Sequence, residues 1–388
     1  MLDKMRLLTP GPTPLPERVR LALSKDMIHH RKAAFTSIMA EIQQKLQVLF
    51  GTSQEVLTLT ASGTGAMVAA MQGLFAPGEK VLIISGGKFG ERWTEIAQSH
   101  GIIPLVLKVP EGQGADPAEV KKSLLADAEI RGVFVQLCET STGVQHPVAE
   151  IAAITSKTPV LLVVDGISGL GICPCPMDDW GLDVLLTGSQ KGLMLPPGLA
   201  LLALSERAWA KAGCITTANY YFNLLEERKN IKQNQTNFTP AIGLLLGLNE
   251  SLNLFMEAGM ENIFRKQWAL CRMAQTGVEA MGLTLFAKKY PSWGVTSVTM
   301  PPQIKAAQVL DIAARNFNVL MAAGQGEYKN RLVRIGHMGW IDWADLSAGI
   351  HALAESCKSL GVEIACDNYL EQSLAAYWQT LEKGYPPL

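Results

Sequence analysis

Seven short apolar runs in the first two thirds of the chain constrain its fold more than any other feature. They lie at residues 56–60, 81–84, 105–109, 133–137, 160–164, 184–187 and 199–204. Many lack an alternation of apolar and polar residues, which is typical of strands covered by helices on both faces. Helical patterns separate several of them, at 65–75, 117–128 and 148–156. This order predicts an α/β fold with a large, mostly parallel sheet of seven strands.

The pattern changes beyond residue 236. A long helical stretch rich in Leu and Met covers residues 237–281, and Gly259 is its expected break. A shorter alternation follows, with strands expected at 294–300 and 331–335 and helices at 304–316 and 343–360. Because 388 residues exceed one ordinary domain, we expect more than one. The predicted division is an N-terminal segment at 1–20, a large α/β domain at 21–259 and a smaller C-terminal α+β domain at 260–388.

Composition excludes several classes of protein. The 34 Lys and Arg residues nearly balance the 35 Asp and Glu residues, which is a poor match for a nucleic acid. With 48% hydrophobic and 18% charged residues, the chain is not intrinsically disordered. It shows neither a signal peptide nor an apolar run of membrane-spanning length, so no membrane partner is expected. Seven scattered cysteines suit a reducing compartment, and we predict a cytoplasmic protein.

Two charged residues follow neighbouring apolar runs. Asp165 comes directly after the run at 160–164, and Lys191 comes shortly after the run at 184–187. Open α/β sheets bind ligands at the carboxyl ends of their strands, so these two side chains can face one ligand. An enzyme that uses pyridoxal 5'-phosphate (PLP) needs such a pair: a lysine that bonds to the cofactor and an aspartate that keeps its pyridine nitrogen protonated. Taken singly, Asp165 is equally well a turn residue and Lys191 a solvated lysine.

The stretch Thr60-Ala61-Ser62-Gly63-Thr64-Gly65-Ala66 follows the first apolar run and opens a helical pattern. Glycines allow close approach of the backbone, and the free N–H groups at a helix start attract an anion such as a phosphate. An ordinary turn is the alternative. The stretch lacks the third glycine of the dinucleotide-binding fingerprint, which argues against a nucleotide-binding dehydrogenase.

The order of several short motifs resembles the class V (fold type I) PLP aminotransferases, close to the alanine–glyoxylate and serine–pyruvate enzymes. The resemblance covers nearly the whole chain. Its motifs are Thr9-Pro10-Gly11-Pro12-Thr13-Pro14, Ser62-Gly63-Thr64-Gly65, Glu139-Thr140-Ser141-Thr142-Gly143, Val164-Asp165-Gly166, Gly188-Ser189-Gln190-Lys191 and Arg334-Ile335-Gly336. It implies a fold type I PLP-transferase that acts as a homodimer on small amino acids and 2-oxo acids.

The resemblance also implies roles for single residues around the cofactor. Lys191 would form the Schiff base and shuttle a proton, and Asp165 would pair with the pyridine nitrogen. Phe89 would stack on the ring where relatives often carry Trp, although it is otherwise simply a core aromatic residue. Thr140 would donate to the phenolic oxygen of the ring. The phosphate would be held by Thr64, Gly65 and Ala66, with help from Gln190 and, across a dimer interface, from Thr236 and Thr239.

Arg334 is an arginine inside an apolar strand pattern. Burying its charge is costly unless the guanidinium meets an anion. The family role is a bidentate clamp on the substrate α-carboxylate, and the alternative is an internal salt bridge. Gly11 would bring the backbone of the N-terminal segment close to the substrate.

Two other motifs carry less information. His29-His30-Arg31 suggests a polar patch at a cleft entrance or a solvated turn. Cys173-Pro174-Cys175 lacks the further ligands that a zinc site needs, so no metal is expected.

The predicted reaction is ping-pong transamination from alanine or serine to glyoxylate or pyruvate. Aspartate or a phosphonate amine on the same fold remains open as the amino donor. Cysteine desulfuration is disfavoured, because desulfurases usually have His immediately before the lysine and Gln190 stands there. A third possibility is a non-catalytic, aminotransferase-like accessory subunit.

Overall fold

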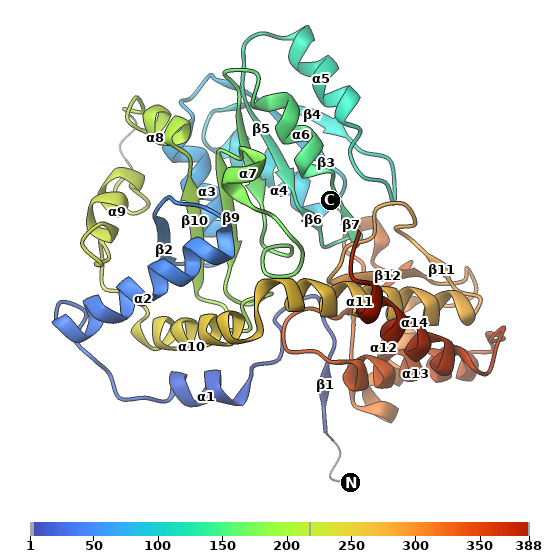
Figure 1. Cartoon of the computed structure of the whole chain (residues 1–388). Helices are drawn as coiled ribbons and strands as arrows, with labels where there is room; N and C mark the ends of the chain where they lie inside the picture. Colours follow the sequence, from blue (N-terminus) through green and yellow to red (C-terminus); the bar gives the residue numbers. More distant parts are fainter. Residues whose placement is uncertain (1–3, 217–218, 387–388) are drawn as a thin grey trace.

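The computed structural model describes residues 4–216 and 219–386. The termini of the predicted first and last domains, residues 1–3 and 387–388, lie outside this part. A seven-stranded sheet with the order β2-β10-β9-β8-β5-β3-β4 forms its centre (Figure 1). The strands are β2 (Val56–Thr60), β3 (Lys80–Ser85), β4 (Ile103–Lys108), β5 (Ile130–Gln136), β8 (Leu161–Asp165), β9 (Val184–Gly188) and β10 (Leu199–Leu204). Only β10 runs antiparallel to its neighbours, so the predicted mostly parallel sheet is confirmed.

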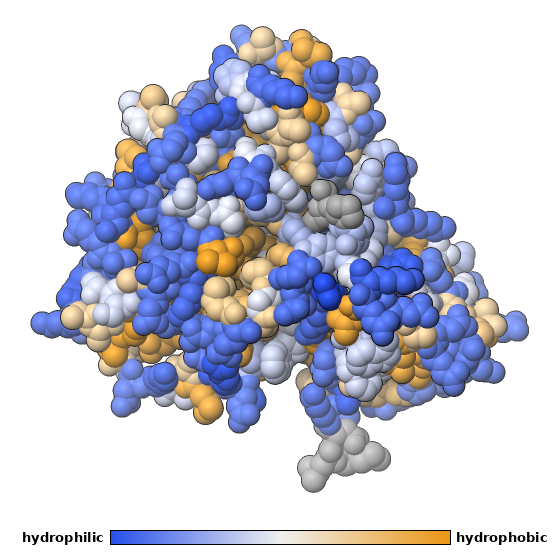
Figure 2. Space-filling model, viewed as in Figure 1, coloured by the Kyte–Doolittle hydropathy of each residue, from blue (hydrophilic) through white to orange (hydrophobic). Residues whose placement is uncertain are grey.

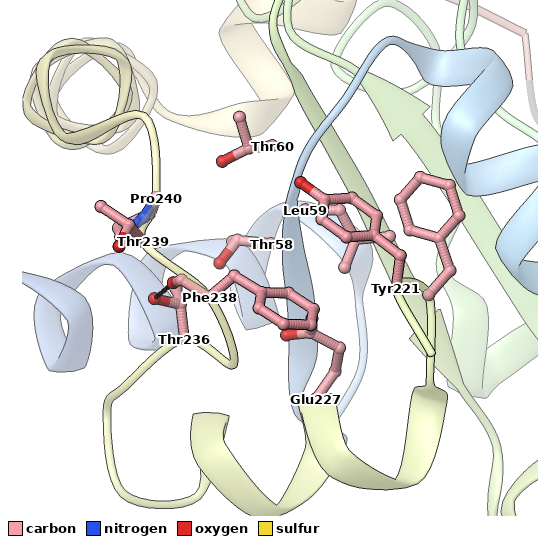
Figure 3. Close-up of a pocket in the computed structure, with 10 residues that line it drawn as sticks. Thr58, Leu59, Thr60, Tyr221, Glu227, Thr236, Phe238, Thr239 and Pro240 are labelled. Atoms are coloured by element: carbon pink, nitrogen blue, oxygen red, sulfur yellow. Dashed lines mark hydrogen bonds between the residues drawn. The ribbon is translucent and has the colours of Figure 1, made fainter. Parts of the chain in front are cut away.

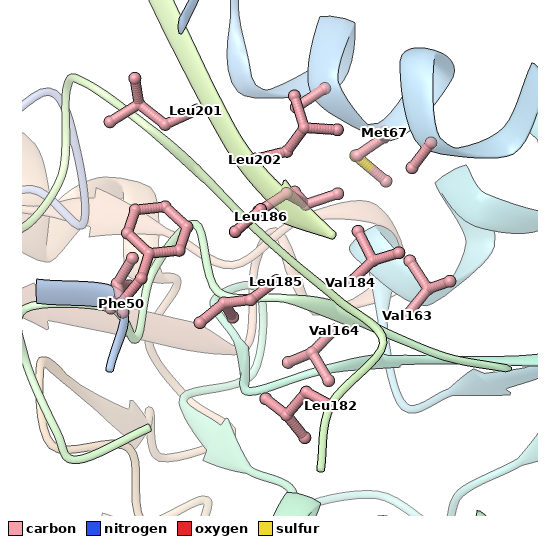
Figure 4. Close-up of a cluster of buried hydrophobic side chains, with 14 of the residues drawn as sticks. Phe50, Met67, Val163, Val164, Leu182, Val184, Leu185, Leu186, Leu201 and Leu202 are labelled. Atoms are coloured by element: carbon pink, nitrogen blue, oxygen red, sulfur yellow. The ribbon is translucent and has the colours of Figure 1, made fainter. Parts of the chain in front are cut away.

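The inner strands of the sheet are buried because helices cover them, whereas the edge strand β4 is partly exposed. All five residues of β8 and all five of β9 are buried, which explains their unbroken apolar sequence. Figure 4 shows the core, in which Met67 of a covering helix packs near Val163, Val184 and Leu202. The helices of this part are α1 (Glu17–Leu23), α2 (Ala33–Phe50), α3 (Gly63–Leu74), α4 (Lys88–Ser99), α5 (Pro117–Ala126), α6 (Val148–Thr155), α7 (Met177–Trp180), α8 (Glu206–Ala212), α9 (Leu224–Ile231) and α10 (Ile242–Ala258).

The C-terminal part has its own four-stranded sheet, with the order β11-β12-β15-β14 and antiparallel pairs. Its strands are β11 (Thr284–Leu285), β12 (Val295–Thr299), β14 (Ala322–Ala323) and β15 (Leu332–Gly336). Its helices are α11 (Met260–Ala280), α12 (Ala306–Phe317), α13 (Trp343–Ser359) and α14 (Tyr369–Lys383), with a short 3-10 turn η1 (Gly326–Tyr328). A second hydrophobic cluster fills this part. The expected break at Gly259 lies between α10 and α11, where its φ is +76°. The domain limits themselves stay a prediction.

The N-terminal segment is attached to the C-terminal part. Strand β1 (Arg6–Leu7) pairs in parallel with β13 (Val319–Leu320), and Leu8 belongs to the second hydrophobic cluster. The amide of Gly336 donates to the carbonyl of Leu8 at 2.7 Å. This attachment directs the residues that follow Leu8 toward the carboxyl ends of the central strands.

The face of the molecule in Figure 2 is mostly hydrophilic, with small apolar patches between the polar groups. Within residues 4–216 and 219–386, no helix combines the length and the apolar character needed to cross a membrane.

Candidate active site

Asp165 and Lys191 lie at the carboxyl ends of two adjacent parallel strands. Asp165 is the last residue of β8 and is paired in register with Leu186 of β9. Lys191 follows β9 by three residues. Both side chains are buried, with 4% of Asp165 and 9% of Lys191 exposed. The fold thus brings together a buried carboxyl and a buried amine at one edge of the sheet.

The N-terminal segment passes directly over Lys191. The Lys191 amine donates to the carbonyl of Pro10, and the hydroxyl of Thr13 donates to the carbonyl of Lys191 at 3.0 Å. Between them, Gly11 has a φ of +127°, and an added Cβ would lie 2.6 Å from the lysine Nζ. Only glycine fits this close approach. Burial lowers the pKa of Lys191 to about 8, so a larger fraction of its amine is neutral and nucleophilic near neutral pH than in an ordinary lysine.

Asp165 is held by one hydrogen bond, in which the amide of Ile167 donates to its Oδ1 at 2.9 Å. Burial raises the pKa of Asp165 to about 7, and the negative charge of Glu139 acts in the same direction. Asp165 forms no ion pair with any residue that the structure describes. A positively charged group bound beside this carboxyl would therefore stabilise its ionised form.

The predicted phosphate loop forms the start of α3, which packs on β9 and β10. The side chain of Ser62, the residue before this helix, makes no capping hydrogen bond, while the amide of Gly65 donates to the Ser62 carbonyl at 2.7 Å. Thr64 is half-buried and Ala66 buried. Across from this start, Gln190 has a buried Oε1 without a partner among the described residues. A helix start together with an unpaired amide group is a suitable environment for a bound anion.

Arg334 and Thr140 approach the same site from the other side. Arg334 is 6% exposed, its Nε donates to the carbonyl of Ala323 at 2.8 Å, and its Nη1 donates to the carbonyl of Thr140 at 2.8 Å. No ion pair of Arg334 exists within the described part of the chain, so the alternative of an internal salt bridge is wrong there. Burial lowers the pKa of Arg334 to about 10. The Thr140 hydroxyl donates to Ser168 Oγ at 2.6 Å.

Phe89 lies half-buried in the first turn of α4. The guanidinium of Arg92, one turn further along, stands 4.9 Å from the centre of the Phe89 ring. Arg92 also donates to Thr64 Oγ1 at 3.2 Å, which links α4 to the start of α3. Sequence reasoning missed Arg92, although its spacing of three residues from Phe89 on a helix could have indicated that both share one face.

Thr236 and Thr239 line a cavity that includes neither Asp165 nor Lys191, and we call it the outer pocket (Figure 3). Its lining includes Thr58 and Thr60 of β2, Tyr221, Glu227, Thr236, Phe238 and Thr239. The structure therefore does not gather these two threonines around Lys191 of the same chain. The Thr236 hydroxyl donates to the carbonyl of Phe238 at 2.7 Å, and the rings of Phe238 and Tyr221 stack at 5.0 Å. Thr239 is exposed.

The motif His29-His30-Arg31 lies beside this loop. Arg31 donates through Nη1 to the Thr236 carbonyl at 2.9 Å and through Nη2 to the Asn237 carbonyl at 3.3 Å. The two histidine rings stack on one another at 5.0 Å. The polar motif that the sequence left without a role thus holds the loop that carries Thr236.

Comparisons with known proteins decide the family. The profile of the aminotransferase class-V family matches residues 8–335. The chain belongs to the class V aminotransferases. The match begins at Leu8 and ends at Ile335, so it includes every residue that we assigned to the site.

Similar proteins cover almost the whole chain. The chain is 36% identical to the soluble hydrogenase 42 kDa subunit of Anabaena cylindrica, covering 94% of this chain and 96% of that one. It is 30% identical to the L-aspartate–glyoxylate aminotransferase of Paracoccus denitrificans, covering 98% of each. It is 32% identical to the serine–glyoxylate aminotransferase of Methylorubrum extorquens, covering 95% and 96%. Among solved structures, the pyridoxamine–pyruvate aminotransferase of Mesorhizobium loti superposes with a TM-score of 0.93 at 27% identity, covering 97% and 98%.

These class V aminotransferases depend on PLP, and the residues present here fit that cofactor. Asp165 offers an unpaired buried carboxyl to a protonated ring nitrogen. Lys191 offers a buried amine of lowered pKa to an aldehyde. The orphaned Oε1 of Gln190 and the uncapped start of α3 mark an unsatisfied polar environment near both.

Proposed function

We propose that the protein transfers the amino group of a small L-amino acid, alanine or serine, to glyoxylate or pyruvate in two half-reactions. The observation that carries this proposal is the buried pair Asp165 and Lys191 with an unpaired Arg334 beside them. Lys191 combines a pKa lowered by burial with a position beside Asp165 at the strand ends, which suits a nucleophilic amine.

When bound, PLP supplies an aldehyde that accepts an amine and a ring that accepts electrons from the substrate. Lys191 would hold the cofactor through its Nζ, and Asp165 would hold a proton on the ring nitrogen. The start of α3 at Thr64, Gly65 and Ala66 would bind the phosphate together with Gln190. Phe89 and Thr140 would fix the plane of the ring.

Lys191 would also move the substrate proton. Its Nζ would serve as the base that accepts the proton at the substrate Cα, because a pKa of about 8 is close to the working pH. The Pro10 carbonyl, which accepts from this amine, orients Nζ from the N-terminal segment.

Arg334 would bind the substrate carboxylate. Two of its nitrogens are fixed by the backbone carbonyls of Ala323 and Thr140, which orients the guanidinium. Gly11 would place backbone against the same substrate and leave little space near its Cα, which favours small amino acids.

We further propose that the active form is a cytoplasmic homodimer, in which Thr236 and Thr239 reach the phosphate site of the partner subunit. This would explain why the two threonines lie in the outer pocket and not beside Lys191. Their loop is held by Arg31, and Thr239 is exposed and free to reach outward.

Two alternatives have specific support. Aspartate as donor is favoured by the similarity to an L-aspartate–glyoxylate aminotransferase, and an accessory subunit by the similarity to a hydrogenase subunit. The chain retains Asp165, Lys191 and Arg334 together, which favours an enzyme over a non-catalytic subunit.

A spectrum and a substrate panel test the proposal. Purified protein should be yellow and should lose its visible band on addition of L-alanine or L-serine. Steady-state rates with alanine, serine and aspartate against glyoxylate and pyruvate should be highest for a small donor. A protein that retains no visible band after incubation with PLP and removal of the free cofactor would contradict the enzyme. A preference for aspartate would replace the proposed donor.

A further inference from the structure

Glu139 is a buried carboxylate that has no part in the proposed reaction. It is fully buried in the short strand β6 (Cys138–Glu139), which pairs with β7 (Val144–Gln145). Its Oε2 accepts from the amides of Phe89 at 3.0 Å and Gly90 at 3.1 Å. Its Oε1 accepts from the amide of Ser141 at 3.1 Å and from the Ser141 hydroxyl. Because all four partners donate, they fit the ionised carboxylate, although burial by itself raises the pKa of Glu139.

These bonds replace the cap that α4 lacks. The residue before this helix is Gly87, which has no side chain to cap it. The first three helical amides, of Lys88, Phe89 and Gly90, donate instead to Ser141 Oγ at 3.0 Å and to Glu139. An N-terminal carboxylate is the usual partner for these amides, but here it comes from another strand.

Gly87 makes room for this arrangement. An added Cβ would lie 2.4 Å from Ser141 Oγ and 2.8 Å from Glu139 Cδ. The backbone there is extended, with a φ of 166°, so an alanine would meet no strain except this collision. Substitution at Gly87 therefore perturbs the same contact from the side of α4.

The start of α4 carries two side chains into the candidate site. Phe89 is in its first turn, and Arg92 follows with its guanidinium over the Phe89 ring and its Nη1 bonded to Thr64. On the other side, Thr140 directly follows Glu139 and binds Arg334 through its carbonyl. The charge of Glu139 acts on Asp165 of β8 and on Arg334 of β15. Glu139 thus ties together the two loops that border the Asp165–Lys191 pair.

We propose that Glu139 is a positioning residue: by capping α4 from β6, it sets where Phe89 and Arg92 stand relative to the cofactor ring and the start of α3. The inference rests on the proposed function, since the ring is that of PLP. The role exceeds ordinary helix capping because the capped turn itself faces the site.

Three variants separate positioning from simple stability. Glu139→Asp keeps the charge but retracts it by one methylene from Phe89 and Gly90. Gly87→Ala pushes on the same carboxylate and is the second route if Glu139→Asp does not fold. Asp116→Ala is the matched control, because Asp116 caps α5 through the Ala118 amide, in a helix that contributes nothing to the site.

The first readout needs no cofactor. In the apo-protein, Glu139→Asp should speed hydrogen exchange at the amides of Phe89 and Gly90, and the control should not. The second readout is PLP affinity, which should fall about tenfold in Glu139→Asp and Gly87→Ala but stay unchanged in Asp116→Ala. In a protein that already carries Phe89→Leu, the further change Glu139→Asp should lower PLP affinity by far less than tenfold. Both substitutions act through the Phe89 ring, so their effects should not add.

The outcomes are distinct. If Glu139→Asp lowers the melting temperature but leaves PLP affinity and the two amides unchanged, the carboxylate is only structural and the proposal fails. Full additivity with Phe89→Leu would also overturn it. If the wild-type protein does not bind PLP at all, the proposed function fails instead, and the exchange readout still reports the cap.

Discussion

The Asp165–Lys191 centre and the outer pocket differ in what encloses them. The centre is bordered by strand ends, by the N-terminal segment and by Arg334, all from one chain. The outer pocket has buried polar groups too, since Thr58 Oγ1 has no partner among the described residues and burial raises the pKa of Glu227 to about 7. However, Tyr221 of its lining is 50% exposed, and the preceding residue Tyr220 is 85% exposed. The contrast fits the proposed homodimer, in which one chain would supply Asp165, Lys191 and Arg334, and Thr236 and Thr239 of the partner subunit would complete the phosphate site.

The largest expected effect is that of Lys191→Ala. Loss of the amine should lower kcat by about 10⁴-fold or more, because both covalent attachment and proton transfer depend on it. Lys122 is an exposed lysine on α5, and the control variant Lys122→Ala should keep the kcat of the wild type. Borohydride reduction and peptide mapping of the wild type should label Lys191, and a label on any other lysine would refute the assignment.

Arg334→Gln should be next in size. Removing a charged, two-point contact to the carboxylate should lower kcat/KM by about 10²-fold, equivalent to about 3 kcal/mol. Arg331→Gln is matched in chain position but pairs with Glu111 at the surface, so it should have little effect. Equal losses in both variants would mean that Arg334 only supports the fold.

The substitution Thr236→Val tests the outer pocket. If its hydroxyl serves the partner subunit, PLP affinity should fall about tenfold in the dimer. A mixture refolded from Thr236→Val and Lys191→Ala chains should regain sites of wild-type affinity, because one site in each mixed dimer then has both groups. If mixing restores nothing, Thr236 acts within its own chain and the outer pocket is not part of a shared site.

The smallest effect concerns pH. Since burial lowers the pKa of Lys191 to about 8, its amine loses its proton as the pH rises through 8. The rate at which apo-protein combines with PLP should therefore rise about tenfold per unit below pH 8 and level off above it, well before the usual range of a lysine. Stopped-flow absorbance measures this rate. A profile that keeps rising to pH 10 would show that Lys191 titrates normally.

The same burial has a consequence for stability. The folded-state pKa of Lys191 lies below its unfolded value of 10.5, so the unfolded chain binds this proton more tightly. Burial of Lys191 therefore lowers the free energy of unfolding most below pH 8, and this destabilising effect disappears as the pH rises to 10.5.

The parts of the fold that sequence patterns predicted are those with local causes. The seven apolar runs became the seven central strands, and helices bury both faces of inner strands such as β8 and β9, whereas the edge strand β4 is partly exposed. Gly259 separates two helices as expected. Helix α4 was not predicted. Its first turn is capped by Glu139, 49 and 50 residues away from the amides it accepts from, so no neighbouring residue signals the start.

The sequence by itself determined the order of strands and helices, the family motifs, and the choice of Asp165, Lys191 and Arg334, because burial and motif spacing are written along the chain. Only the tertiary structure decided how these residues meet. It bent the N-terminal segment back through β1 so that Pro10 and Gly11 cover Lys191. It also placed Thr236 away from that lysine and brought Arg31 to its loop. Such contacts join residues about 180 to 200 positions apart in the sequence. Their proximity in space depends on how whole helices and strands pack, and not on local propensity.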